Sequence, residues 1–481
     1  MNPCWALSFL ILLLAEEATG ASIEKKLSEL KEKHEEKFAR CLTGSPSATP
    51  ETSDKKRDGR VLYPIGYGAD PTGGKDSSDA ILQALGDAFR LRTERELLSG
   101  ISDFGGEVID LQGGSYKISK PIRFPSSGGG NILVRGGTLR ASDTFPGDRH
   151  LIELWSKDSP PPNEKVQNAG YYYEDITFRD ILFDSSNRGG GILIVDSARI
   201  RINNCFFLHF TTQGILVQRG HETFISSCFL GQRSTVGGSK DEKHFAGTAI
   251  DLDSNDNAVT DVAIFSAAIG IVLRGQANIL TGVHCYNKAT AFGGIGILVK
   301  LAGCSQTRID NCYLDYTAIV MEDPVQVHVT NGFFLGDANV VLKSVNGQIS
   351  GLNIVDNMFS GQADKMVPII KLQGKFSDVD QVVIDRNNVN GMRLKSTVGK
   401  LTVAGNGTKW VANFSSLLVF PNRINHLQYS FYTKGERKFT AHAVTHVSKN
   451  VVAVESEKAV NGVVSMIVDQ YSRIGEKNLL V

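Results

Sequence analysis

The sequence has no net charge, because 51 Lys and Arg residues balance 51 Asp and Glu residues over 481 positions. No global positive field therefore attracts nucleic acid or an anionic membrane, and we expect neither as a partner. Proline is scarce, with 14 residues, and tryptophan scarcer, with 3. The 7 cysteines are too few for a disulfide scaffold in so long a chain, and they form no CxxC pair of the kind that binds zinc.

Apolar runs long enough to cross a membrane are also missing. Residues 5–15 are apolar apart from Ser8, and three small residues follow at positions 18–20. A short apolar run followed by small residues is typical of a secretory signal peptide, although a buried helix has a similar composition. We interpret residues 1–20 as a signal peptide and expect a secreted, extracellular protein.

Two acceptor sequons for N-linked glycosylation agree with secretion. Asn406 begins the sequence Asn-Gly-Thr, and Asn413 begins Asn-Phe-Ser. We expect both as glycosylation sites.

Glycine, in contrast, is abundant, with 49 residues. Hydrophobic residues make up 41% of the chain and charged residues 21%, which is typical of a globular protein. A glycine-rich, proline-poor chain without a collagen repeat needs many tight turns, and this favours a β architecture.

The segment between the signal peptide and the main domain is charged. Residues 22–42 place apolar side chains near helical spacing among Lys and Glu, and residues 43–58 form a linker rich in Ser, Thr and Pro. We interpret residues 21–60 as a solvated arm, with a helix that docks on a partner as the alternative. Residues 77–91 predict one short helix at the start of the main domain.

Two short phrases alternate through the main domain. The first reads apolar, any, polar, small, aromatic, as in Ile202 to Phe206 and Ile309 to Tyr313, with looser copies such as Gly282 to Tyr286. The second is a small residue followed by apolar, any, apolar, any, and its copies recur about every 21 to 35 residues. They begin at Gly191, Gly214, Ala249, Gly270, Gly296, Ala318 and Asn339, with a weaker copy at Ile369.

Two short strands per coil, repeated at least seven times with polar turns between them, predict a right-handed parallel β-helix, an all-β fold. A sandwich or barrel would not keep two phrases in register over so many repeats. We assign the β-helix to residues 61–399 and terminal strands or a cap to residues 400–481. The predicted core consists of Ile192/Ile194, Ile215/Val217, Ile250/Leu252, Ile271/Leu273, Ile297/Val299, Ile319/Met321 and Val340/Leu342.

The same register predicts two columns of outward side chains. One contains Asp251 among apolar residues, and the other runs Val195, Gln218, Asp253, Arg274, Lys300, Glu322, Lys343. Charged side chains one strand spacing apart form a groove suited to an extended polymer. A solvated stripe whose opposite charges neutralise one another is the alternative.

Asp251 and Asp253 are our candidate catalytic residues. They lie two positions apart on one strand and therefore point to the same face, roughly 6 to 7 Å apart. Inverting glycosidases place their acid and base roughly 6.5 to 9.5 Å apart. The alternative is that both carboxylates only cap loop amides. Nearby we assign substrate binding to Arg274, Lys300, Glu322 and Lys343.

Other polar residues are weaker candidates. His284 falls in the polar position of the first phrase, where a side-chain ladder would close a turn, while His221 and His244 lie in loops and are potential proton shuttles. Cys205 and Cys228 stack one coil apart, which fits either a disulfide or two small core residues.

Residues 63–79 and 105–118 resemble the opening motifs of the pectate-lyase-like β-helix superfamily. Together with the length, the signal peptide and the charged arm, they make the chain similar to the plant QUARTET-type polygalacturonases. The resemblance implies secretion to the cell wall and hydrolysis of the α-1,4-galacturonan of pectin, during degradation of the pollen mother cell wall that separates microspores.

The chain departs from ordinary polygalacturonases at their catalytic motifs. Their Asn-Thr-Asp-Gly-Ile-Asp-Ile-Asp-Ser motif aligns with residues 246–254 and matches at Ile250, Asp251, Asp253 and Ser254, but its first, catalytic Asp falls on Thr248. Their Gly-His-Gly motif meets residues 294–296 without a histidine, and their Arg-Ile-Lys motif meets residues 320–322. Either the site is rebuilt around Asp251 and Asp253, or activity is weak or absent.

We therefore expect a monomeric pectin hydrolase that needs no cofactor or metal and has homogalacturonan as its partner. Calcium-dependent β-elimination and non-enzymatic pectin binding are the alternatives.

Overall fold

The structure is a computed structural model. It describes residues 55–91, 106–160, 170–232, 245–286, 293–300, 305–435 and 439–472 with their side chains, and the backbone of residues 96–98 and 101–102. The predicted signal peptide, and all but the last residues of the charged arm, lie outside the described residues. Within the described part, no helix is both long enough and apolar enough to span a bilayer.

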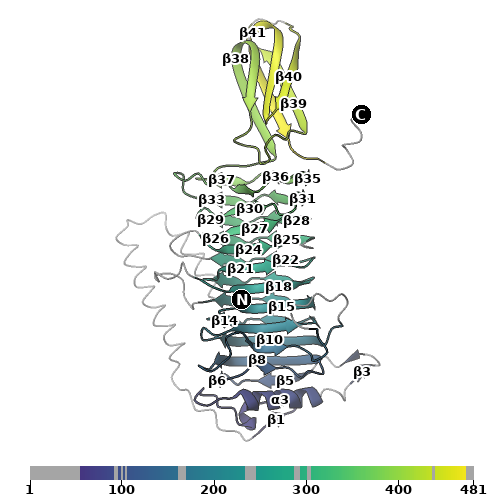
Figure 1. The fold of residues 1–481 in the computed structure, drawn as a ribbon, viewed down its shortest axis with the longest axis vertical. Helices are drawn as coiled ribbons and strands as arrows, with labels where there is room; N and C mark the ends of the chain where they lie inside the picture. Colours follow the sequence, from purple (N-terminus) through teal and green to yellow (C-terminus); the bar gives the residue numbers. More distant parts are fainter. Residues whose placement is uncertain are drawn as a thin grey trace, which may run out of the picture. The chain divides into compact units, whose positions relative to one another are not determined.

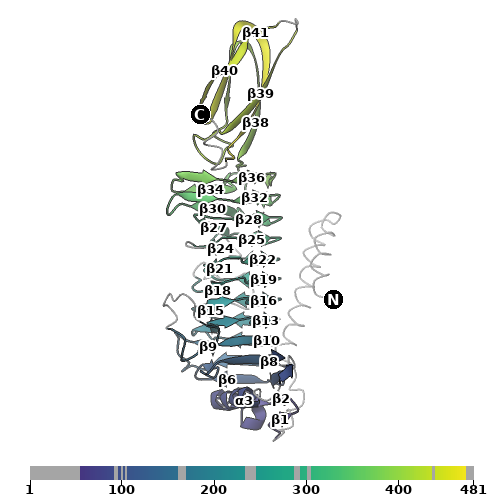
Figure 2. The same cartoon turned by 90° about the vertical axis from the view of Figure 1, so that its right-hand side faces the viewer.

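Stacked coils form the main body, and each coil contributes short strands to three faces (Figures 1 and 2). Each strand pairs in parallel with the equivalent strand of the next coil, and 33 described strands join into one sheet. This confirms the predicted parallel β-helix. A third face was not predicted. Each copy of the first phrase contains part of a second-face strand and the start of a third-face strand, so the two strands looked like one.

The first face carries the second phrase of the repeat. Its strands are β7 (Ile122–Arg123), β9 (His150–Leu154), β11 (Gly190–Val195), β15 (Gln213–His221), β18 (Thr248–Asn255), β21 (Ile269–Leu273), β24 (Ile295–Val299), β27 (Ala318–Glu322), β30 (Asn339–Lys343) and β34 (Ile370–Gln373).

The second face runs beside it. Its strands are β2 (Val61–Leu62), β5 (Glu107–Asp110), β8 (Gly129–Ala141), β10 (Tyr173–Asp184), β13 (Arg201–Asn203), β16 (Phe224–Ser226), β19 (Ala258–Thr260), β22 (Ile279–Thr281), β25 (Thr307–Asp310), β28 (Val327–Thr330), β32 (Asn353–Val355) and β36 (Val383–Asp385).

The third face begins with β6 (Ser115–Ile118) and includes the last residues of β8 and β10. Its other strands are β14 (Phe206–Leu208), β17 (Phe229–Gly231), β20 (Ala263–Phe265), β23 (His284–Tyr286), β26 (Tyr313–Asp315), β29 (Phe333–Leu335), β33 (Met358–Ser360) and β37 (Asn388–Asn390). Short accessory strands flank the coils: β1 (Arg57–Asp58), β3 (Glu96–Leu98), β4 (Ile101–Ser102), β12 (Ser197–Ala198), β31 (Gln348–Ser350) and β35 (Asp378–Asp380).

The predicted core columns are confirmed. Ile192 pairs with Ile215, which pairs with Ile250 and then Ile271, and all four side chains are fully buried. The column continues without a break to Ile370 on β34. Identical apolar positions in every coil therefore fill the interior, and strand alternation sends the intervening residues outward.

A single left-handed residue joins the second face to the third in successive coils. Asn204, Ser227 and Asn311 hold this position with φ between 51° and 54°, and asparagine tolerates that conformation best among residues with a side chain. In one coil Gly282 takes the position, with φ 65°. Our placement of His284 in this polar column is therefore wrong by two residues, because glycine removes the polar signal that marks the turn.

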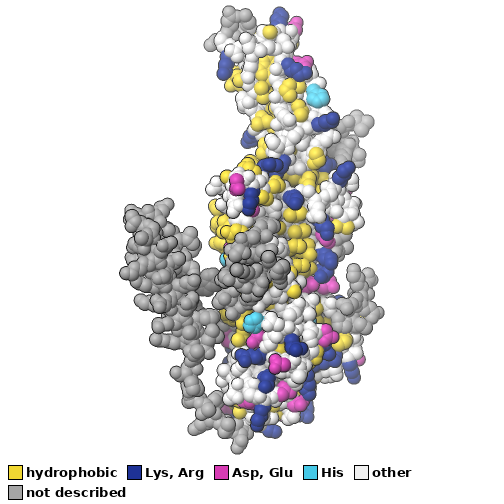
Figure 3. Space-filling model, turned by 60° about the vertical axis from the view of Figure 1, so that its left-hand side comes forward, with side chains coloured by type: hydrophobic (Ala, Val, Ile, Leu, Met, Phe, Trp, Pro, Cys, Tyr) yellow, Lys and Arg dark blue, Asp and Glu magenta, His cyan; other side chains and the backbone are white. Residues whose placement is uncertain are grey.

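His284 belongs instead to an outward column of the third face that is largely aromatic. It pairs in register with Tyr313, and its Nε2 lies 2.8 Å from Asp315 Oδ2. Tyr313 and Phe333 stack with ring centroids 4.7 Å apart, and Tyr313 remains 37% exposed. Figure 3, with this side turned forward, shows hydrophobic side chains gathered over the middle coils. The rings of Tyr313 and Phe333 contact face to face, so mainly their edges reach the surface.

One helix covers the first coils. It is α3 (Ser78–Leu91), as predicted for residues 77–91, and it follows a 3₁₀ turn, η1 (Pro64–Tyr67). Asp76 Oδ1 accepts a hydrogen bond from the Ser78 amide at 3.2 Å and caps the first turn. Ile81 and Leu85 are buried with the core, so the helix closes the apolar end of the stack.

Four antiparallel strands follow the last coil. They are β38 (Val398–Asn413), β39 (His426–Thr433), β40 (His442–Ser448) and β41 (Val451–Asp469), and they enclose a core of their own around Trp410 and Phe414. The Gln470 amide donates to the Thr397 carbonyl, so the chain returns to the base of this sheet. Its predicted role as a cap stays a prediction.

Cys205 and Cys228 are free thiols, each buried in the stack. Of the two alternatives for this pair, the structure selects core packing.

The valines of β30 test the core column. Val340 points inward and is fully buried, whereas Val341 points outward and is half-buried. We expect Val340→Ala to lower the free energy of unfolding by about 2 kcal/mol, because it leaves a cavity in a packed column. Val341→Ala, the matched control, should cost under about 1 kcal/mol. Urea denaturation measures both, and equal losses would contradict the assigned register.

His150 predicts a pH dependence of stability. It is 5% exposed, and burial lowers the pKa of its imidazole to about 4. Histidine in an unfolded chain titrates near pH 6.5, so between roughly pH 6.5 and 4 the unfolded state binds a proton that the folded state excludes. Stability should be complete above pH 6.5 and fall by about 3 kcal/mol towards pH 4. His150→Gln should remove that part of the pH dependence; the same urea midpoints at each pH in both proteins would count against it.

Candidate functional site

The first face carries two outward columns in the register expected. Asp251 pairs with Leu216 on one side and with Val272 on the other, and Asp253 pairs with Gln218. Glu322 pairs with Lys343 on the last coils. Polar groups are concentrated in the column of Asp253, whereas the column of Asp251 is mostly apolar.

Asp251 and Asp253 share a face but differ in environment. Asp251 is only 6% exposed, while Asp253 is exposed. Within the described part of the chain, the Asp253 carboxylate has no ion-pair or hydrogen-bond partner. The pair thus combines one enclosed carboxylate with one that solvent and a bound polymer can reach.

Arg274 lies against Asp251. Its Nε donates to Asp251 Oδ1 at 2.8 Å and its terminal nitrogen to Oδ2 at 2.9 Å, in a two-bond fork. This geometry stabilises the ionised carboxylate and fixes its orientation. The predicted role of Arg274 in substrate binding stays a prediction, but much of its charge is already matched by Asp251.

The other predicted binding residues divide into two kinds. Lys300 is half-buried and has no ion-pair partner among the described residues. Lys343 Nζ lies 3.0 Å from Glu322 Oε1, with Glu322 more enclosed than Lys343. At this end of the column, opposite charges do neutralise one another, as the alternative interpretation had it.

The face extends further than the candidate residues indicated. Lys371 on β34 is exposed and continues the column of Asp251 beyond Val341. At the other end, Glu153 on β9 occupies the same column and pairs with Arg149. The weak repeat copy at Ile369 contained the signal for Lys371, because extending the register by one coil places it outward.

Histidine is present beside the face. His221 Nε2 lies 2.7 Å from Asp256 Oδ2, and His221 is in register with Asn255 at the end of β18. His244 lies outside the described residues. Thr248, at the position of the first catalytic Asp in the motif of ordinary polygalacturonases, is half-buried at the start of β18.

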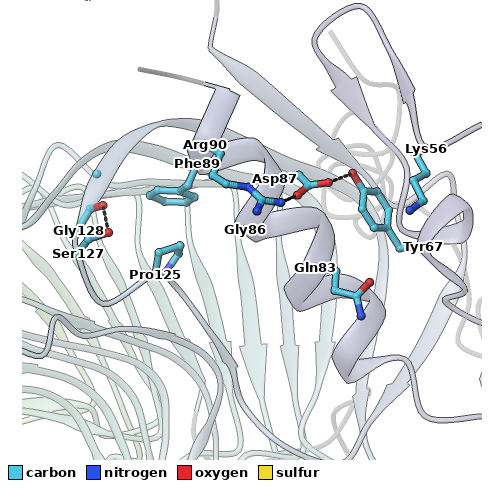
Figure 4. A pocket seen from close by; sticks show the side chains of 11 residues that line it. Lys56, Tyr67, Gln83, Gly86, Asp87, Phe89, Arg90, Pro125, Ser127 and Gly128 are labelled. Carbon is cyan, nitrogen blue, oxygen red and sulfur yellow. Dashed lines mark hydrogen bonds and ion pairs between the residues drawn. The ribbon is translucent and has the colours of Figure 1, made fainter. Parts of the chain in front are cut away.

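A recess of about 900 Å³ lies elsewhere, beside α3 (Figure 4). The Tyr67 hydroxyl donates to Asp87 Oδ2 at 2.8 Å, and Arg90 pairs with the same carboxylate. No residue that lines it belongs to the polar columns. In the described ranges, no three His, Cys, Asp or Glu side chains lie together as a metal site.

Comparison with known proteins gives one strong similarity. The chain is 50% identical over 465 residues to a protein of Arabidopsis thaliana named Polygalacturonase QRT3, covering 95% of each chain. No protein-family model matches the chain.

Solved structures are more distant. The mannuronan C-5 epimerase AlgE4 A-module of Azotobacter vinelandii is 14% identical, covers 69% of this chain and 96% of its own, and has a TM-score of 0.46. The endo-xylogalacturonan hydrolase of Aspergillus tubingensis is 10% identical, covers 69% and 92%, and has a TM-score of 0.44.

The fork between Asp251 and Arg274 is open to a double-mutant cycle. It joins two bonds to a carboxylate side chain that is only 8% exposed, although the side chain of Arg274 itself is 32% exposed, so we expect a coupling free energy of about 1 to 3 kcal/mol between Asp251→Ala and Arg274→Ala. The single-bond pair Glu322 and Lys343 serves as the matched control and should couple by about 1 kcal/mol or less. Urea unfolding of each variant gives the values, and equal coupling in both pairs would refute the distinction.

Proposed function

The chain belongs to the QRT3-type polygalacturonase family, and on this premise we propose that it hydrolyses the α-1,4-galacturonan of pectin. The observation that carries the proposal is the pair of outward carboxylates, Asp251 and Asp253, on one strand of a long polar face. Alternate residues of a strand lie about 6 to 7 Å apart, which suits an acid and a base with a water molecule between them.

We assign the two roles from the environments of the carboxylates. The two-bond fork from Arg274 fixes the orientation of the Asp251 carboxylate, so Asp251 acts as the base that takes a proton from the attacking water. Each oxygen of a carboxylate has a second lone pair, so the fork leaves an acceptor for that water. Asp253 gives its proton to the glycosidic oxygen as the bond to the anomeric carbon breaks, and the product has inverted configuration.

Cations along the same face bind the substrate's carboxylates. Lys300 is one column position beyond Arg274, and Lys371 lies further along. Lys343, paired with Glu322, contributes a hydrogen-bonding group as well as charge. A chain of galacturonate units laid across the coils thus meets ammonium groups on several of them.

The same premise extends to the setting. We propose secretion into the plant cell wall and a role in degrading the pollen mother cell wall, so that microspores separate. Asn406 and Asn413 are exposed on β38, which suits glycosylation at both sequons in a secreted protein.

A second function, pectin binding without hydrolysis, is favoured by one observation. Thr248 occupies the position of the first catalytic Asp of ordinary polygalacturonases, and the enclosed carboxylate of the pair already bonds to Arg274. An uncleaved polymer would then occupy the same face.

Asp253→Asn tests the proposal. It removes the acid while keeping the side chain's shape, so release of reducing ends from de-esterified polygalacturonate should fall at least about 100-fold, the scale of general acid catalysis. Asp261→Asn, at an exposed turn between the second and third faces, is the matched control and should keep wild-type activity.

Product analysis separates the alternatives. Hydrolysis gives saturated reducing ends, whereas β-elimination gives an unsaturated product that absorbs ultraviolet light. Full activity of Asp253→Asn would refute the site assignment, and wild-type binding without any cleavage would favour the second function.

A further inference from the structure

A second polar recess lies on a different face of the coils. It has a volume of about 540 Å³ and is formed by the second-face strands β25, β28, β32 and β36 with the segment after β41. Most of its lining residues have polar side chains, and Val383 is its one aliphatic residue. None of its residues contributes to the columns of Asp251 and Asp253.

Two columns of polar side chains build the recess. Arg308, His328 and Asn353 occupy equivalent outward positions on successive coils, as the strand register shows. Gln306 and Gln326 precede Arg308 and His328 by two residues, and both have left-handed backbone angles, with φ 58° and 51°. The recess therefore offers a pair of hydrogen-bonding side chains on each of two neighbouring coils, spaced by the strand separation of about 4.8 Å.

The charge in the recess is positive. Arg308 is exposed, and its guanidinium has no ion-pair or hydrogen-bond partner in the described part of the chain. At the neighbouring positions, Asn353 Nδ2 lies 2.9 Å from His328 Nε2, and this contact fixes the orientation of both groups. Five donor groups of one guanidinium are thus available to an anion, beside amides that suit hydroxyl groups.

An aromatic wall completes the recess. Tyr471 follows β41 and is half-buried beside the last coils. The adjacent Ser472 carbonyl accepts a hydrogen bond from the main-chain N–H of Gln381 at 2.8 Å. The Ser472 hydroxyl donates to the Val379 carbonyl at 3.1 Å. The chain that carries Tyr471 is thereby tied to the coils, which places an apolar ring against a polar surface.

We propose that this recess is a second binding site for an acidic oligosaccharide, separate from the face that carries Asp251 and Asp253. Arg308 pairs with a sugar carboxylate, and Asn353 and Gln326 bond to ring hydroxyls. The identity of the acidic sugar as galacturonate rests on the proposed function. A polymer held here stays attached to the protein while another stretch occupies the first face, which raises the local substrate concentration.

The composition of the recess favours a saccharide over a protein segment. A peptide-binding groove normally presents large apolar side chains to anchor its partner, whereas this lining is mostly amide, hydroxyl, imidazole and guanidinium groups, with one tyrosine and one valine. A lone arginine among amides and one imidazole also fits a chain with spaced carboxylates better than a dense polyphosphate, which needs several cations.

The test counts binding sites on the full chain. Calorimetric titration of Asp253→Asn protein with a galacturonate oligosaccharide of defined length should give two sites. Adding Arg308→Ala should weaken the second site by about tenfold or more, which is the scale of a lost charged hydrogen bond. Gln326→Glu should weaken the second site to a similar degree, because the new carboxylate repels the sugar carboxylate without enlarging the recess. The affinity for a neutral galactan oligosaccharide should not change in this variant.

Arg201→Ala is the matched control. Arg201 occupies the same second-face column four coils earlier and lies outside the recess, so its loss changes the net charge equally. Two unchanged sites in both the Arg308→Ala and Gln326→Glu proteins, with thermal unfolding like that of the control, would overturn the proposal.

The rate of hydrolysis is measured separately from binding. Arg308→Ala should cleave short soluble galacturonate oligomers at the wild-type rate, because it leaves the first face intact. If the wild-type chain cleaves nothing but still loses one site in Arg308→Ala, the recess stands and the proposed hydrolase function fails. If cleavage occurs and both sites persist in the recess variants, the hydrolase function stands and the recess proposal fails.

Discussion

The coil-to-coil register of parallel strands is the constraint on which the rest of the structure depends. Because Ile192, Ile215, Ile250 and Ile271 stack in hydrogen-bonded register, every side chain between them is forced outward at a fixed spacing. The same hydrogen-bonded ladder therefore sets the positions of the core residues and of the outward side chains. Apolar residues on one side of each strand stabilise the stack, and residues on the other side form the surface.

That arrangement explains how one fold carries three different surfaces. The first face presents carboxylates and ammonium groups, the second ends in amides and a guanidinium, and the third presents stacked aromatic edges. Each coil contributes one residue to each column, so the character of a surface can change from one coil to the next, as where Asp251 lies between Leu216 and Val272. The fork between Asp251 and Arg274 crosses from one column to the next and breaks this simple order.

Periodicity in the sequence predicted the strand register, but it could not predict features that depend on side-chain reach or on a coil that lacks the usual signal. Alternation around Ile250 and Leu252 was enough to place Asp251 and Asp253 together. It did not reveal that the long side chain of Arg274 reaches back one coil to Asp251. His284 was misplaced because Gly282 stands where other coils have a polar residue. The recess around Arg308 was missed because it needs the second face and the returning segment at Tyr471, which are far apart in the sequence.

The ladder also dictates which changes of chain length this protein tolerates. One residue inserted within a strand would turn its inward side chains outward and expose the core, since side chains alternate with a period of two. The same residue inserted between β17 and β18, where the copies of the repeat are furthest apart, leaves the register untouched. Relatives of this chain should therefore differ in length at the turns and lose or gain whole coils, and each added coil would lengthen every surface by about 4.8 Å.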